Sequence, residues 1–225
     1  MPERELLHLV LRAFCLPKWT PGKNLHSHSP HLVAHPWTHP PLSSIFYVSM
    51  AKLVPENHPA LHTIAEELTA EDFDSGAVAK IVKGLRAAIK TYDVDGYAAV
   101  AIAAPQIGVS KRLFLIEDQS DRDDALPTVI AVNPRITKVS KKTHEVGEGC
   151  LSIPDTYGLV TRHKNVTIEA LDENGTPFTR GAGGLLAQII QHENDHLDGI
   201  LFTDRSDKVW HKGEKPLDGS EDTED

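Results

Sequence analysis

The sequence predicts an α+β fold, with short mixed or antiparallel β-sheets packed around a central helix that carries a His-Glu-x-x-His motif. Three observations predict it: one helical pattern, then several short β-compatible segments, then a second helical pattern. Because the strand segments follow one another rather than alternating with helices, a parallel sheet of βαβ units is disfavoured. A chain of 225 residues has the length of one well-packed domain with some residues to spare.

The two helices are predicted from their apolar spacing. Residues 72–92 hold apolar side chains three or four positions apart, which is the period of one helix face. Residues 184–197 repeat this pattern with leucines and isoleucines at positions 185, 186, 189 and 190. The second helix therefore has an apolar face suited to a protein core.

The strands between the helices are short apolar runs rich in β-branched residues. A turn is predicted at Asp172–Gly175, where Asn-Gly closes a polar stretch. The predicted strands are residues 112–116, 128–132, 136–139, 159–161 and 166–171.

The two ends of the chain differ from the middle in composition. Residues 1–49 hold 7 of the 15 prolines and 6 of the 13 histidines and show no regular period. We interpret them as a disordered or non-native extension: a leader peptide, or an upstream stretch if translation starts at Met50. The catalytic domain is expected at residues 50–211, and residues 212–225 are expected to be an acidic, disordered tail.

Charge and cysteine content exclude several classes of function. The net charge of −9 disfavours nonspecific binding to DNA, whose phosphates would repel the surface. The sequence has no apolar run of the roughly 18 residues that a membrane span requires. The two cysteines, Cys15 and Cys150, form no disulfide framework, which indicates a reducing compartment. We expect a cytoplasmic protein, or an imported organellar one if residues 1–49 are a transit peptide.

The second helix carries a candidate metal site in His192-Glu193-Asn194-Asp195-His196. Residues four apart lie on one helix face, so the imidazoles of His192 and His196 can reach one cation. Glu193 lies beside the first histidine and is placed to handle protons. The alternative is a buried cluster without metal, which is disfavoured because buried charges need partners.

The third ligand is not given by the helix itself. One metalloprotease class adds Gly-x-x-His after the motif, and this chain supplies Gly199 but has Phe202 in place of the histidine. Cys150 is the remaining strong candidate, because a thiolate suits zinc or ferrous iron. Alone, Cys150 would be read as a small buried apolar residue.

Three sequence blocks together resemble the signature motifs of peptide deformylases. They stand in the family's order, and the second and third match fully. The resemblance extends from about Leu53 to about Phe202 and includes the segments 58–61 and 170–175. The three blocks are Ala101–Gly108, Glu148–Ser152 and Gln191–His196.

The resemblance implies a hydrolase that removes the formyl group from formyl-methionyl nascent peptides. It implies that Glu193 takes a proton from the attacking water and returns one to the leaving amine. It also implies that Gln106 and the backbone N–H of Leu151 hold the oxyanion. Asp195 would support the ligands from behind, with Arg162 suggested as its partner. The implied metal ligands are Cys150, His192 and His196, with water as the fourth.

The family suggests Fe²⁺ as the native cofactor, while the ligand types also admit Zn²⁺, Ni²⁺ or Co²⁺. The expected partners are formylated nascent peptides near the ribosome, with neither DNA nor membrane, and a monomer is the default expectation. Two other functions stay open: a deformylase-like metallohydrolase with a different acyl or peptide substrate, and a binding protein that kept the fold.

Two departures from the family pattern concern the substrate rather than the metal. Ala99 and Ala101 stand where the family has glycine, on the strand that runs beside the bound peptide, and their methyl groups are expected to narrow the cleft. Gln188 stands where the family often has an apolar residue that lines the pocket for the methionine side chain. Its side chain is expected either to point away from this pocket or to make the pocket more polar. Leu185 and Val146 are apolar neighbours suited to that pocket.

Overall fold

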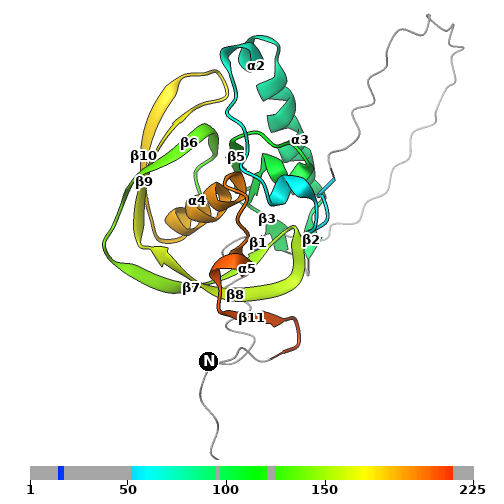
Figure 1. Ribbon diagram of the computed structural model, residues 1–225, viewed down its shortest axis with the longest axis vertical. Coiled ribbons are helices and arrows are strands. Elements are labelled where there is room, and N and C mark those ends of the chain that lie inside the picture. Colours follow the sequence, from blue (N-terminus) through cyan, green and yellow to red (C-terminus); the bar gives the residue numbers. More distant parts are fainter. Residues whose placement is uncertain (1–14, 18–51, 95–96, 121–124, 215–225) are drawn as a thin grey trace, which may run out of the picture.

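The computed structural model describes residues 15–17, 52–94, 97–120 and 125–214. It confirms a mixed α+β architecture in which the named strands pair in antiparallel fashion (Figure 1). The predicted extension at 1–49 lies outside the described residues except for β1 (Cys15–Pro17), which pairs with β3 (Tyr97–Ala99). The predicted acidic tail lies outside them from residue 215 onward. None of the described helices is long and apolar enough to cross a lipid bilayer.

Two sheets position the candidate site. The smaller one has the order β11 (Lys208–His211), β8 (Ile153–His163), β7 (Thr143–Cys150). A third sheet, apart from these two, has the order β1, β3, β2 (Asp93–Val94). The larger one has the order β10 (Pro177–Gly183), β9 (Asn165–Leu171), β6 (Val129–Val139), β5 (Leu113–Ile116), β4 (Ala101–Ala103).

Helix α4 (Gly184–Leu197) matches the predicted bounds and lies within the curve of the strands (Figure 1). It contacts β4, β5, β8, β9, β10 and the short 3₁₀ helix η2 (Ala104–Ile107). Ile189 and Ile190 are fully buried in the core that covers the larger sheet, and Leu185 and Leu186 pack against it partly buried. Its buried polar side chains are bonded mainly to β7 and β8. The helix is thus apolar towards one sheet and polar towards the other.

The single helix predicted at residues 72–92 is in fact two helices, α2 (Ala70–Asp74) and α3 (Ala77–Thr91). The break lies at Gly76, whose φ of 74° is left-handed and ends the helical path. The apolar spacing continues across this break, so periodicity alone did not reveal it. The apolar face of α3 forms a second core with residues of β5 and η2.

The strands predicted at 128–132 and 136–139 are one strand, β6, with an irregular middle. Asn133 adopts a φ of 51°, and Pro134 has no N–H to donate to the ladder. The Asn133 side chain instead bonds the backbone N–H and C=O of Leu68, at 2.8 Å each. The bulge therefore ties β6 to the segment that leads into α2.

A shorter 3₁₀ helix, η1 (Pro59–Leu61), and a last helical turn, α5 (Phe202–Arg205), complete the fold. The predicted turn at 172–175 joins β9 to β10 and is held by the Asp172 side chain, which accepts from the N–H groups of Asn174 and Thr176. β10 then runs directly into α4. This hairpin therefore sets where the helix with the metal motif begins.

Candidate metal centre

Three candidate metal ligands, one cysteine sulfur and two histidine nitrogens, lie together in one buried place. Cys150 ends β7, just before the tight turn of Leu151 and Ser152 that leads into β8. His192 and His196 lie one turn apart on α4. The ligating atoms of the three side chains all lie within 4.8 Å of one another, and the Cys150 sulfur is 3.2 Å from Nε2 of His196.

The chemistry of this donor set fits a single divalent metal ion. Burial raises the pKa of the Cys150 thiol to about 12, and burial together with nearby His192 lowers the pKa of His196 well below its ordinary value. Two neutral imidazoles and a thiol that ionises on coordination are ligands of zinc or ferrous iron. Three protein ligands leave a coordination position open, which is typical of catalytic rather than structural metal sites.

Glu193 is buried beside the three ligands and its Oε2 lacks a hydrogen-bond partner among the described residues. Burial, together with the negative charge of Glu148, raises its pKa well above the ordinary value. A buried carboxyl with an unused oxygen and a raised pKa is suited to accept and return a proton near neutral pH. The unused oxygen is also consistent with a reacting group that binds here.

Gln106 presents its amide nitrogen to the site because its oxygen is already engaged. The Ala103 N–H donates to Oε1 of Gln106 at 2.8 Å, which fixes the orientation of the amide. Nε2 then faces the Cys150 sulfur at 3.6 Å and the Ser152 hydroxyl at 3.3 Å. Leu151 is buried in the turn next to Cys150. Gln106 and Leu151 thus both lie next to Cys150, one of the three candidate metal ligands.

Glu148 is a site residue to which sequence reasoning gave no role. It is fully buried, and its Oε2 lies 3.0 Å from Nδ1 of His192, which leaves Nε2 of that ring for a metal. The available signal was proximity in the sequence, because Glu148 precedes Cys150 by only two positions in β7. Burial would raise the pKa of Glu148, but hydrogen bonds from Arg162 and His192 outweigh it and lower the pKa to about 2.

Arg162 joins Glu148 to Asp195, the partner suggested for it from the sequence. Its Nε and Nη2 donate to the two oxygens of Glu148 at 2.7 and 2.8 Å, and Nη1 donates to Asp195 at 2.5 Å. The Arg162 side chain is 4% exposed, so these bonds form away from bulk water. The hypothesis of an Arg162–Asp195 pair is confirmed, and the structure adds Glu148 as the link to His192.

Replacing Arg162 with Ala is expected to weaken both the fold and the metal centre. Two buried carboxylates would lose their shared cation, which typically costs about 3–5 kcal/mol of unfolding free energy. Metal release should become roughly 10–100-fold faster, because the orientation of His192 is no longer fixed. Thermal unfolding and metal release to a chelator measure the two effects. Arg135→Ala, at an exposed ion pair with Glu67, is the matched control, and equal behaviour of the two variants would contradict the prediction.

Comparison with known proteins identifies the family. The family described as polypeptide deformylase matches residues 50–212, which is most of the chain. The chain belongs to the polypeptide deformylase family.

Individual deformylases match over most of their length. A peptide deformylase of Shouchella clausii is 36% identical over 180 residues, which covers 76% of this chain and 98% of that protein. The actinonin-bound class I type b deformylase of Acinetobacter baumannii has a TM-score of 0.61 at 30% identity, covering 70% of this chain and 98% of the other. The same enzyme bound to Met-Ala-Ser gives a TM-score of 0.61 at 32% identity, covering 68% and 96%.

The departures from the deformylase pattern have defined surroundings. Ala99 and Ala101 are 1% and 4% exposed, and their side chains pack into the two apolar cores. Gln188 is buried and donates from Nε2 to the Gly147 carbonyl at 2.9 Å, so its amide is bonded to the backbone of β7. Gln188 thus connects α4 to β7, the strand that ends at Cys150.

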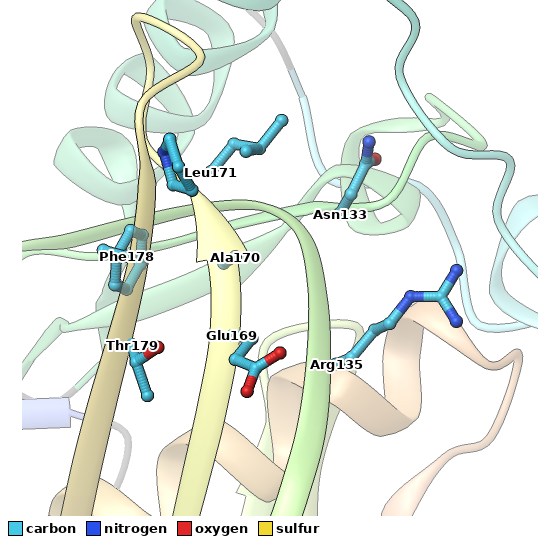
Figure 2. Close-up of a pocket in the computed structure, with 8 residues that line it drawn as sticks. Asn133, Arg135, Glu169, Ala170, Leu171, Phe178 and Thr179 are labelled. Carbon is cyan, nitrogen blue, oxygen red and sulfur yellow. The ribbon is translucent and has the colours of Figure 1, made fainter.

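Two surface hollows lie elsewhere on this deformylase-family chain. One of about 390 Å³ lies over β6, β9 and β10, and Figure 2 shows Arg135, Glu169 and Thr179 among its lining residues. The other, of about 450 Å³, lies beside α3 with Glu173 at its edge. No lining residue of either is a metal ligand or is bonded to one. Both hollows are therefore separate from the candidate metal centre.

Proposed function

We propose that this protein is a metal-dependent amide hydrolase that removes the N-terminal formyl group from formyl-methionyl peptides. The observation that carries the proposal is the meeting of Cys150, His192 and His196 with Glu193 and Gln106 in one buried place. The A. baumannii relative was solved with Met-Ala-Ser, the form that a formylated Met-Ala-Ser takes after loss of its formyl group. The family and this geometry support the same reaction.

α4 would supply two metal ligands and the group that transfers protons, and the end of β7 would supply the third ligand. Cys150, His192 and His196 would hold the metal, and the chemistry it would supply is activation of water as a nucleophile near neutral pH. Glu193 accepts the proton of the attacking water and gives a proton to the amine that leaves. Its burial suits this shuttle, since no bulk water competes for the proton.

Gln106 and Leu151 would stabilise the oxygen of the formyl group as it gains negative charge. Nε2 of Gln106 is already aimed at the site by the bond that Ala103 donates to Oε1. The backbone N–H of Leu151 is the second donor. Donors that are fixed before the reaction cost no reorganisation when the charge develops.

Replacing Gln106 with Ala is therefore expected to lower kcat by about 10²–10³-fold, the usual loss of one oxyanion donor. KM should change much less, because the donor acts mainly on the transition state. Steady-state formate release with a formyl-Met peptide measures both constants. Gln119→Ala, which removes an exposed glutamine outside the site, serves as the matched control. A Gln106→Ala enzyme with unchanged kcat would contradict this role.

We propose Fe²⁺ as the native metal, with Zn²⁺, Ni²⁺ and Co²⁺ as ions that the same ligands accept. The substrates would be nascent chains at the ribosome, met by a monomer in the cytoplasm. Leu185 and Val146 would contact the methionine side chain.

Anaerobic purification of the full chain, metal analysis and a formate-release assay with formyl-Met-Ala-Ser test the proposal. Chelator-sensitive formate release is expected. Bound metal without formate release would instead favour a different acyl substrate, and protein purified without metal would favour a binding role.

A further inference from the structure

We propose that Arg205 is a positioning residue for the metal centre, acting on His192 through Asp195, Arg162 and Glu148. The inference rests on the metal centre of the proposed function. It concerns α5, a helix of four residues that contributes neither a ligand nor a proton carrier. Two side chains of α5, Phe202 and Arg205, nevertheless reach the helix that carries the histidines.

Phe202 occupies the position where another metalloprotease class has its third histidine. Here its ring stacks on the ring of His192, with centroids 6.5 Å apart and planes inclined by 23°. The side chain is 1% exposed, so the contact is fully buried. α5 therefore borders the first metal-binding histidine directly, and Arg205 follows on the next turn.

Arg205 makes a two-pronged ion pair with Asp195, the residue next to His196. Its Nε donates to Oδ2 at 2.6 Å and its Nη2 to Oδ1 at 2.5 Å. Arg162 donates to the same carboxylate and, through its other nitrogens, to Glu148. An unbroken series of charge-assisted bonds thus runs from Arg205 to Nδ1 of His192.

The formal charges of this series balance only when Arg205 is included. Glu148 and Asp195 contribute −2, Arg162 and Arg205 contribute +2, and the sum is zero. Without Arg205, two buried carboxylates compete for the single guanidinium of Arg162. Asp195 would then draw Arg162 away from Glu148, and the hydrogen bond that orients His192 would weaken.

Arg205 is also the exposed end of the series. Its side chain is 41% exposed, whereas those of Arg162 and Asp195 are 4% and 8% exposed. A substitution at this position therefore changes the charge balance without opening a cavity in the core. This makes Arg205→Gln a milder perturbation of folding than a change at Arg162.

The test loads the full chain with cobalt and measures its absorption spectrum and the rate of cobalt release to a chelator. We expect Arg205→Gln to release cobalt about tenfold faster, at the lower end of the effect of outer partners of metal ligands, with shifted cobalt bands. Arg205→Lys keeps the charge but loses the two-pronged ion pair, so its cobalt release rate should lie between those of the unmodified protein and Arg205→Gln. Arg135→Gln, at an exposed ion pair, should match the unmodified protein.

A double mutant tests the route through Glu148. In a Glu148→Gln background the link to His192 is already weakened, so adding Arg205→Gln should change the release rate less than twofold. Equal effects of Arg205→Gln in both backgrounds would overturn the route. Unchanged cobalt release and spectrum in Arg205→Gln would overturn the inference alone. An unmodified protein that binds no cobalt would overturn the proposed metal centre and the inference with it.

Discussion

Replacing Glu193 with Gln is expected to reduce formate release by about 10³-fold while the metal stays bound, within the 10²–10⁴-fold range of general acid–base catalysis. Glutamine keeps the shape of the side chain but cannot accept the proton of the attacking water. It also cannot return a proton to the leaving amine, so both halves of the reaction are affected. The three candidate ligands are unchanged by this substitution, because Glu193 is not one of them.

Formate release by matched, metal-saturated samples of Glu193→Gln and the unmodified enzyme measures this loss. Metal content must be determined on the same samples. Glu173→Gln, in the exposed turn between β9 and β10, is the control for loss of one carboxylate. A Glu193→Gln enzyme with full activity and full metal content would show that another group transfers the proton.

Replacing Cys150 with Ala is expected to abolish activity through loss of the metal. The two remaining imidazoles of His192 and His196 cannot complete the three-ligand set of a catalytic site. We expect affinity to fall by more than about 100-fold, because even partners outside the ligand shell are worth about 10–100-fold. The cost in folding should be small, since alanine also suits a buried apolar position.

Metal content after purification and formate release at a fixed metal concentration measure this outcome. Cys15→Ala is the matched control, because it removes the other cysteine of the chain and should keep both metal and activity. A Cys150→Ala protein that retains one metal ion per chain would exclude the cysteine from the ligand set.

The parts of this molecule that repeat a simple period could be predicted from the sequence. α4 was predicted with its observed bounds, because its apolar and polar positions follow the helical period. The spacing of His192 and His196 likewise indicated that both rings reach one point. The role of Cys150 needed the resemblance to deformylases, since nothing local distinguishes it from a small buried apolar residue.

The parts that depend on contacts between distant segments could not be predicted in this way. The break at Gly76 and the bulge at Asn133 arise from left-handed backbone conformations that interrupt otherwise regular patterns. β8 begins at Ile153, earlier than the predicted residue 159, because Pro154 and Asp155 are residue types that are not typical of strands. Arg205 lies in a segment with no motif, and only the fold brings it to Asp195.

The candidate metal site depends on the residue spacing in one strand, β7, and in one helix, α4. Glu148 lies two positions before Cys150 at the end of a strand, and His192 and His196 are four apart on a helix, so the spacing within each pair decides which groups face the site. One residue inserted in β7 directly before Glu148 would turn Glu148 to the opposite face of the strand and remove the partner of His192. Gain or loss of residues should therefore be tolerated in the exposed β9–β10 turn near Asn174 and excluded from the β7–β8 hairpin. The β7–β8 hairpin can therefore vary in its exposed side chains but not in its length.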